Sequence, residues 1–394
     1  MDSTTFYTDQ MAALDGHAAE ASNQKISEQD TAAETSTPVS AGQVPAAQNA
    51  TSQVSAAQVS ATQVSAAQVS AAQLLAALYG PIGGALADVE DRIHCELQSQ
   101  YESLVPLLRH GTQLGGKRLR PAMLLLCAAA VNEINDSHIA LGTVIEMVHT
   151  ATLIHDDVLD EADTRRHVPT INSRWDNHTS ILLGDFLFAQ SFRLAASVGC
   201  TETCQMVGEA ARRICEGELR QVLDRNVIDL DEETYIDILR GKTAELCQVA
   251  CQLGSKHAGG DEAITTAMGQ YGDAVGIAFQ IADDYLDLWG DDKTVGKTLG
   301  TDIEQGKMTL PIIRLLETAS ADDRHRIVAI ITGPPAQRID QIRDWLEASD
   351  ARDYTAGVAK RYQQEAIDAL RGLEPSQAKD CLLAIASFAV DRTF

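Results

Sequence analysis

The stretch HDDVLDEADTRRH, residues 155–167, groups acidic side chains directly before a pair of arginines. Three carboxylates, Asp156, Asp157 and Asp160, lie within five residues and precede two adjacent arginines. Like charges at positions i and i+4 destabilise a helix by about 0.2–0.5 kcal/mol. A bound divalent cation would relieve this repulsion, so the pattern predicts an acidic metal site on a helix.

The same spacing occurs a second time in FQIADDYLDLWGDD, residues 279–292, which contains Asp283, Asp284 and Asp287. Residues i and i+4 share one helical face, so each copy directs two carboxylates the same way. If the two helices face each other, their carboxylates converge on one cavity. Hard oxygen ligands without histidine or cysteine favour Mg²⁺, which also binds substrate phosphates. A single copy would be explained by a solvated helix face, but two copies with apolar neighbours favour a shared, buried site.

Around these motifs the apolar residues recur at helical spacing, which predicts an all-α fold. The pattern is clear in residues 139–153, 235–253 and 263–288. Helix ends are expected at glycine and proline clusters, which are Gly115-Gly116, Gly199, Gly259-Gly260 and Gly333-Pro334-Pro335. We expect one large bundle of ten or more helices around a central cavity, formed by residues 76–394.

Residues 1–75 have a different composition and are expected to form a disordered tail. Between Val54 and Gln73 the chain repeats the unit VSAAQ, with VSATQ once, and this stretch holds no aromatic and no charged residue. Such small side chains cannot bury a core against the entropy of ordering. The tail is interpreted as a spacer or a tether.

The composition excludes some classes of binding partner and indicates where in the cell the protein is located. A formal net charge of −25 disfavours nucleic acid and anionic membrane surfaces. The acidic start lacks a secretory signal, and the longest apolar run, residues 122–131, is too short for a transmembrane segment. We therefore expect a cytoplasmic protein. The cysteine pairs Cys200/Cys204 and Cys247/Cys251 lack the spacing of a zinc knuckle and favour small core residues instead.

Basic residues occur where phosphate groups could bind. LGGKRLRP, residues 114–121, places Lys117, Arg118 and Arg120 after a glycine pair at a helix start, where amide groups also favour anions. Guanidinium groups bind phosphate oxygens in pairs. The other basic positions beside glycines or acid motifs are Arg165, Arg166, Lys242, Lys297 and Lys307.

The motifs GGKRLRP, DDVLDEADTRRH, GKTAE, FQIADDYLD and GKTLGTDIEQGKMTLP follow one another in this order. With them the chain, over about residues 80–394, resembles the trans-isoprenyl diphosphate synthases, and most of all their long-chain polyprenyl members. The resemblance implies a homodimeric, Mg²⁺-dependent prenyltransferase. It would condense isopentenyl diphosphate head-to-tail with an allylic diphosphate such as farnesyl or geranyl diphosphate, giving an all-trans polyprenyl diphosphate for a quinone side chain.

The resemblance also implies roles for single residues. Asp156 and Asp160, with Asp283 opposite, would hold about three Mg²⁺ ions that bridge to the allylic diphosphate, supported by Asp157, Asp284 and Asp287. The isopentenyl diphosphate would be bound by Lys117, Arg120, His149 and Arg166. The allylic end would be surrounded by Arg165, Lys242, Thr243, Gln280, Lys297 and Lys307. Asp156, Asp283 and Lys242 would act in catalysis. One departure is His167, where many relatives have glycine.

Product length is expected to depend on the helix before Asp156. The growing tail would pass Thr152, Ala151, Val148 and Met147, where each turn of a helix rising about 1.5 Å per residue backs roughly one isoprene unit. Short-chain relatives have aromatic residues four or five positions before the first aspartate, and Thr152 and Ala151 are small. We therefore expect a product of more than about four isoprene units, and the resemblance implies about six to nine.

Three other functions remain open from the sequence. A terpene cyclase would share the first aspartate motif but would not need the GGKRLRP segment. A non-catalytic subunit of a heteromeric synthase would tend to lose one aspartate motif, and both are complete here. A synthase of geranylgeranyl diphosphate or another shorter product would keep all five motifs.

Overall fold

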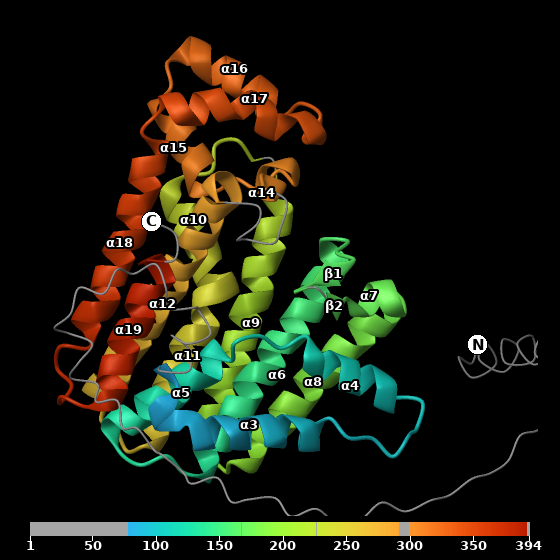
Figure 1. Ribbon diagram of the computed structural model, residues 1–394, viewed down its shortest axis with the longest axis vertical. Coiled ribbons are helices and arrows are strands. Elements are labelled where there is room, and N and C mark those ends of the chain that lie inside the picture. The colour runs from blue at the N-terminus through green and yellow to red at the C-terminus, as the bar shows by residue number, and fades with distance from the viewer. Residues whose placement is uncertain (1–77, 167, 226, 291–298, 392–394) are drawn as a thin grey trace, which may run out of the picture. The chain divides into compact units, whose positions relative to one another are not determined.

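The computed structural model describes residues 78–166, 168–225, 227–290 and 299–391, and these residues are mainly helical (Figure 1). The expected all-α class is confirmed. The tail predicted for residues 1–75 lies outside the described residues. The helices of eight residues or more are α3 (Gly83–Glu96), α4 (Val105–Gln113), α5 (Leu119–Val131), α6 (Asp136–Leu159), α8 (Asn177–Ser197), α9 (Thr201–Leu223), α10 (Glu232–Leu239), α11 (Glu245–His257), α12 (Glu262–Trp289), α15 (Leu310–Thr318), α16 (Ala321–Ile331), α17 (Pro335–Ala348), α18 (Ala351–Ala369) and α19 (Gln377–Asp391).

Shorter elements connect these helices. They are the 3₁₀ turn η2 (Gly80–Ile82), α7 (Ile171–Arg174), the π-helical segment η3 (Arg240–Ala244), α14 (Thr301–Glu304) and the strands β1 (Thr164–Arg165) and β2 (Val168–Pro169). The strands form a two-residue antiparallel pair just after the first aspartate motif. The predicted helix breaks are confirmed, since each glycine or proline cluster lies between two helices or at the first residue of one.

Helix α6 is the central helix of the first half of the bundle. Asn135 caps its N-terminus by accepting a hydrogen bond from the Ser137 amide at 3.0 Å. The helix packs against α8, α5, α3 and α11 (Figure 1). Among the described residues it is the helix that is long and apolar enough to span a membrane, and 67% of its most apolar window is buried in the protein. Its C-terminal turn carries the first aspartate motif.

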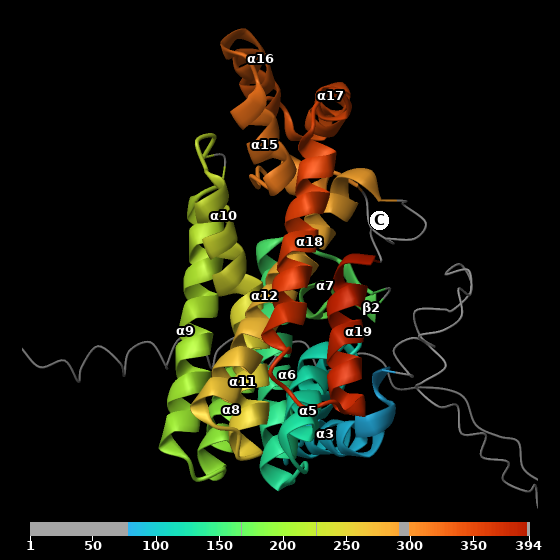
Figure 2. The same cartoon turned by 90° about the vertical axis from the view of Figure 1, so that its left-hand side faces the viewer.

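Helix α12 is the central helix of the second half and carries the second aspartate motif in its last turns. The Asp261 side chain caps it by accepting from the Ile264 amide at 2.8 Å. The helix packs against α11 and α18, and the three run side by side in Figure 2. Cys247 and Cys251 on α11 are buried, as expected for small core residues, whereas Cys200 and Cys204 are partly exposed.

The helical pattern predicted for residues 235–253 is interrupted by a feature that the periodicity did not reveal. Between α10 and α11 the chain forms the π-helical segment η3, which contains Lys242. This segment packs against α9 at Gly217, where an added Cβ would lie 2.6 Å from the Lys242 amide nitrogen. A larger residue at Gly217 would therefore displace the backbone of Lys242. Such single-turn π segments often occur at functional sites.

Candidate active site

The first aspartate motif lies at the C-terminal end of α6, with Asp160 as its cap residue. Asp157 is buried and accepts a hydrogen bond from Nε of Arg165 at 2.8 Å. Asp156 is partly exposed on another side of the helix. Burial and the neighbouring Asp160 raise the pKa of Asp156, although Lys242 opposes the shift. Asp156 and Asp160 are thus the partly exposed carboxylates of this motif, while Asp157 joins the helix to the segment that follows.

The second aspartate motif is arranged in the same way on α12. Asp284 is buried, and its two oxygens accept from Tyr235 Oη at 2.7 Å and Gln280 Nε2 at 3.0 Å. Asp287 accepts from the backbone amides of Thr301 and Asp302, both at 3.2 Å. Asp283 is partly exposed.

Carboxylates crowd together at this second motif. Burial and the nearby Asp302 raise the pKa of Asp284 from 3.8 to about 8. The same two causes raise the pKa of Asp287 to about 6. Burial is the larger cause in both residues, and a divalent cation bound here would stabilise the ionised form of these carboxylates.

Lys307 connects the two motifs. Its ammonium nitrogen lies 3.3 Å from Oδ1 of Asp302, beside the second motif, and 4.0 Å from Oδ1 of Asp160 in the first. Arg225 lies 3.6 Å from the same Asp160 oxygen. Lys307 therefore links Asp160 of the first motif to Asp302 beside the second, whereas the convergence of the motif carboxylates on one cavity stays a prediction.

Lys242 projects from η3 between the two motifs. Its Nζ donates to Glu218 Oε2 at 2.8 Å and to Gln221 Oε1 at 2.9 Å, both on α9. Burial favours the neutral amine, but Asp156 and Glu218 outweigh it and raise the pKa of Lys242. Lys242 is therefore a fixed positive charge facing the first motif.

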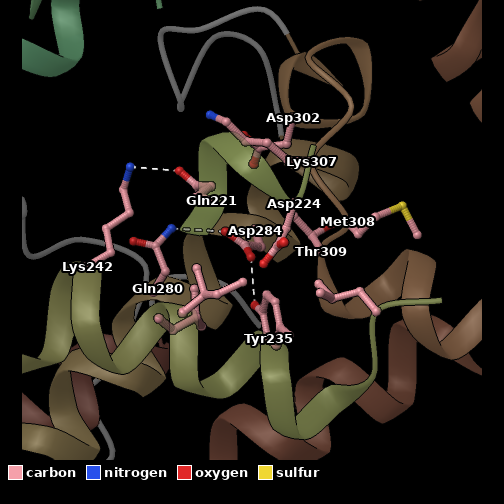
Figure 3. A pocket seen from close by; sticks show the side chains of 13 residues that line it. Gln221, Asp224, Tyr235, Lys242, Gln280, Asp284, Asp302, Lys307, Met308 and Thr309 are labelled. Carbon is pink, nitrogen blue, oxygen red and sulfur yellow. Dashed lines mark hydrogen bonds and ion pairs between the residues drawn. The ribbon is translucent and has the colours of Figure 1, made fainter. Parts of the chain in front are cut away.

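A pocket open to solvent lies between α9, α10, α12, α14 and the segment that follows α14. Figure 3 shows Lys242 directed toward Gln221, and Tyr235 and Gln280 directed toward Asp284. The pocket is lined by Gln221, Asp224, Leu230, Tyr235, Ile238, Leu239, Lys242, Gln280, Asp284, Asp302, Lys307, Met308 and Thr309.

Four side chains in or beside this pocket form a hydrogen-bonded chain. Thr243 Oγ1 donates to Gln280 Oε1 at 3.1 Å, and Gln280 donates in turn to Asp284. Tyr235 completes the chain by donating to the other oxygen of Asp284. Thr243 and Gln280, both predicted at the allylic end, are thus brought together, and their orientation depends on a buried carboxylate.

Three of the four residues predicted to bind isopentenyl diphosphate, Arg120, His149 and Arg166, lie together near the start of α5 and the middle of α6. Arg120 Nη1 donates to His149 Nε2 at 3.1 Å. Burial, followed by the charges of Arg120 and Arg166, lowers the pKa of His149 well below its usual value. His149 is therefore neutral, which leaves its ring nitrogen free to accept from Arg120. Arg166 donates to the carbonyl of Leu114 at 3.1 Å, so the glycine loop is tied to the cluster.

Arg118 has a structural role that its place in GGKRLRP did not reveal. It caps α5 with a φ of 52°, a left-handed conformation that is uncommon outside glycine. Its guanidinium pairs with Glu90 and with the buried Glu146, whose Oε1 lies 2.6 Å from Nη1. Arg118 is therefore engaged inside the protein, whereas Lys117 is exposed, with its ammonium 5.4 Å from the ring centre of Phe388.

The remaining predicted residues are placed as follows. Arg165 binds Asp157, and Lys297 lies outside the described residues. Met147 lines a second, smaller pocket with Thr150 and Leu187. The other residues predicted to control product length are not part of the lining of either cavity: Val148 and Ala151, which are buried, and Thr152, which is partly buried.

The side chains fit an Mg²⁺ site in which other ligands complete the coordination. Among the residues that the structure describes, no three histidine, cysteine, aspartate or glutamate side chains converge tightly enough to hold a metal alone. Mg²⁺ usually takes only one or two carboxylates and fills its octahedron with water and substrate phosphates. Asp156, Asp160 and Asp283 are the partly exposed carboxylates that such ions would use.

Sequence reasoning missed several residues of the site. Asp302 lies within the fifth motif and Tyr235 at the start of a predicted helical segment, but neither was assigned a role, because their contacts with the second aspartate motif cross long sequence separations. Glu218, Gln221 and Arg225 recur at spacings of three, four and seven residues along α9 and just beyond its end. That spacing places them on one face, which was the available signal, although a solvated helix shows the same pattern.

Comparison with known proteins shows similarity in both sequence and fold. The Polyprenyl synthetase family profile matches residues 102–348. Heptaprenyl diphosphate synthase component 2 of Geobacillus stearothermophilus is 33% identical, over 81% of this chain and 99% of that protein.

Two solved structures show the same likeness. The crystal structure of a decaprenyl diphosphate synthase from Rhodobacter capsulatus matches with a TM-score of 0.76 and 32% identity, over 80% of this chain and 98% of that one. A polyprenyl synthase from Caulobacter crescentus CB15, complexed with calcium and isoprenyl diphosphate, matches with a TM-score of 0.75 and 33% identity, over 81% and 98% of the two chains.

Proposed function

This chain belongs to the polyprenyl synthetase family and is a prenyltransferase, and we propose that it condenses isopentenyl diphosphate head-to-tail with an allylic diphosphate. The product would be a long-chain all-trans polyprenyl diphosphate for a quinone side chain. The proposal rests on two separate groups of residues that could each bind a diphosphate. In the first, Lys307 lies close to Asp160 of one aspartate motif and to Asp302 beside the other, where metal ions would bind the allylic diphosphate. In the second, arginines surround His149 and would bind isopentenyl diphosphate directly.

The arrangement accounts for the two halves of the reaction. Asp156, Asp160 and Asp283 would hold Mg²⁺, which neutralises the charge of the allylic diphosphate as it leaves. Lys242 and Lys307 are cations fixed beside these carboxylates, so they can stabilise the same developing charge without reorganising. Cleavage of the carbon–oxygen bond then yields diphosphate and an allylic carbocation.

Other residues would control the carbocation and its partner. The hydroxyl oxygen of Thr243 and the amide oxygen of Gln280 are held together near the pocket, where they can face the cation with partial negative charge. Lys117, Arg120 and Arg166 would grip isopentenyl diphosphate so that its double bond meets the cation. The last step is loss of a proton, for which the released diphosphate is a sufficient base.

The proposed metal and substrates agree with what is bound in a relative. The Caulobacter crescentus structure is complexed with calcium and isoprenyl diphosphate. Calcium and Mg²⁺ both take oxygen ligands, and Mg²⁺ is the ion that commonly combines one or two carboxylates with substrate phosphates. We therefore assign Mg²⁺ to this site.

We propose that the protein is a homodimer that pairs through α8. Four large apolar side chains of that helix are exposed, which is typical of a covered interaction surface; they are Ile181, Leu182, Phe186 and Phe192. Sedimentation of Leu182→Glu should show monomers where the natural protein sediments as a dimer. An unchanged dimer in that variant would place the interface elsewhere.

We also propose a cytoplasmic location and a catalytic domain formed by residues 76–394. Helix α6, which has the length and composition of a membrane span, is largely buried and ends in the aspartate motif. This supports a role inside the bundle. Because residues 1–75 contain none of the five motifs, a protein that lacks them should keep the activity of the full chain.

A direct assay tests the proposed function. The purified single chain is incubated with isopentenyl diphosphate, farnesyl diphosphate and Mg²⁺, and the products are identified by mass. We expect chains longer than geranylgeranyl diphosphate, and no product in the presence of a metal chelator. Products no longer than geranylgeranyl diphosphate would assign a shorter-chain synthase. A correctly folded chain that makes product only with a second protein would show a heteromeric enzyme.

A further inference from the structure

Helix α14 is a single turn that carries Asp302 and leads directly to Lys307, the residue between the two aspartate motifs. Its N-terminal end is held by α12. The Asp287 carboxylate accepts from the amides of Thr301 and Asp302, and the Asp287 carbonyl accepts from the Gly300 amide at 2.7 Å. A single turn has little stability of its own, so contacts such as these must determine its position.

The C-terminal end of α14 is held by a residue outside the active site. Arg338 of α17 is only 7% exposed. Its Nη1 donates to the carbonyls of Ile303 and Glu304, both at 3.0 Å, and its Nε donates to the carbonyl of Gly333 at 3.1 Å. None of the ion pairs found within the described ranges involves Arg338, so carbonyl dipoles compensate its buried charge.

The neighbouring residue of α17 also fixes α14. Gly300, which precedes the helix, has a φ of 78°, and an added Cβ there would lie 2.5 Å from Cγ1 of Ile339. Helix α17 therefore touches both ends of α14, with Ile339 against Gly300 and Arg338 on the last carbonyls. The position of α14 depends on α17 as well as on α12.

We propose that Arg338 is a positioning residue for the active site, which holds α14 so that Asp302 and Lys307 stay between the two aspartate motifs. The chain of contacts is continuous. Arg338 binds the carbonyls of the last two residues of α14, the Lys307 amide donates to the Asp302 carbonyl at 2.9 Å, and Lys307 Nζ reaches Asp302 and Asp160. This role rests on the proposed function, because it assigns Lys307 to the allylic diphosphate.

Loss of the Arg338 guanidinium should weaken binding at the aspartate motifs and leave the isopentenyl diphosphate site unchanged. The carbonyls of α14 would lose charge-assisted hydrogen bonds, and the turn would open more often. Asp302 and Lys307 would then be less often in place, which weakens binding of Mg²⁺ and of the allylic diphosphate. The cluster of Arg120 and His149 lies on α5 and α6, so the KM for isopentenyl diphosphate should not change.

The first measurement uses hydrogen–deuterium exchange of the full-length, metal-free protein, and so is independent of activity. In Arg338→Met, we expect amide exchange in residues 299–307 to be faster on the order of tenfold, the effect of one charge-assisted hydrogen bond. Arg338→Lys should give an intermediate rate, since an ammonium cannot reach all three carbonyls. Arg343→Met is the matched control, because Arg343 is an exposed residue of the same helix.

The second measurement compares steady-state kinetics. Arg338→Met should raise the half-saturating Mg²⁺ concentration and the KM for the allylic diphosphate, with the KM for isopentenyl diphosphate unchanged and partial rescue in Arg338→Lys. Unchanged exchange at residues 299–307, or equal KM increases for both substrates, would overturn the assignment. Loss of protection throughout the bundle would also overturn it, since Arg338 would then stabilise the fold in general. A natural protein without prenyl transfer would refute the proposed function instead, while the exchange data would still decide whether Arg338 holds α14.

Discussion

The ammonium nitrogen of Lys307, in the segment after α14, lies 4.0 Å from Oδ1 of Asp160 at the end of α6. Asp160 ends the first aspartate motif, whereas Lys307 follows the second by twenty residues. A cation at this position can contact a diphosphate that is bound between the two motifs. The predictions below follow from this two-sided arrangement.

The two-wall metal site is tested by Asp156→Asn and Asp283→Asn. Each variant should lower kcat by about 100-fold or more, comparable to the loss of one group that stabilises transition-state charge. In the absence of Mg²⁺, Asp156→Asn should raise Tm, because the pKa of Asp156 is raised in the folded protein and the ionised form is disfavoured. The exposed Asp344→Asn serves as the control. Near-normal turnover in either motif variant would refute the shared site.

If each diphosphate has its own binding site, variants at the two sites should have different kinetic defects. Arg120→Ala should raise the KM for isopentenyl diphosphate about 10- to 100-fold, the cost of a lost hydrogen bond to a charged group. Lys242→Ala should mainly lower the rate at which the allylic substrate ionises, measured by single-turnover kinetics. If both variants change the same kinetic constants for the same substrate, the assignment of the pockets is wrong.

Asp284 predicts how stability depends on pH in the metal-free protein. Burial and Asp302 raise its pKa from 3.8 to about 8, so the folded protein holds a proton that the unfolded chain releases above about pH 4. The stabilisation by this proton is complete below pH 4 and is lost as the pH rises to 8. Asp284→Asn imitates the protonated form, and so should be more stable than the natural protein at pH 8 by more than ~1 kcal/mol.

Denaturant unfolding at both pH values measures this difference, and at pH 4 the two proteins should differ little. Added Mg²⁺ should narrow the gap at pH 8 if it stabilises the ionised carboxylates. An Asn variant that is less stable than the natural protein at pH 8 would contradict the predicted protonation of Asp284.

Product length is tested by Ala151→Phe. Ala151 is fully buried on α6, five residues before Asp156. If the growing tail passes this position, a phenylalanine should shorten the product to about three or four isoprene units, since each helical turn backs roughly one unit. The masses of the products show the result, and Ala151→Val should have a smaller effect. An active variant with unchanged products would mean that Ala151 is small only to let helices pack.

The sequence was sufficient to predict the helical class, the helix ends and both aspartate motifs, because each depends on local spacing. It did not reveal the π-helical segment around Lys242, whose backbone is determined by its contact with Gly217 on another helix. It grouped Arg118 with the phosphate-binding residues, although its partners Glu90 and Glu146 each lie 28 residues away. Contacts of this kind arise only when the chain has folded, so no local pattern contains them.

The central claim is that one diphosphate is held between both aspartate motifs. Crystals of the full chain grown with Mn²⁺ in place of Mg²⁺ and with pyrophosphate would locate the ions by their anomalous scattering. We predict ions bound by Asp156 and Asp160 on one side and by Asp283 on the other, with pyrophosphate between them and Lys307 in contact with it. Ions on one motif alone, with pyrophosphate elsewhere, would contradict the two-sided site.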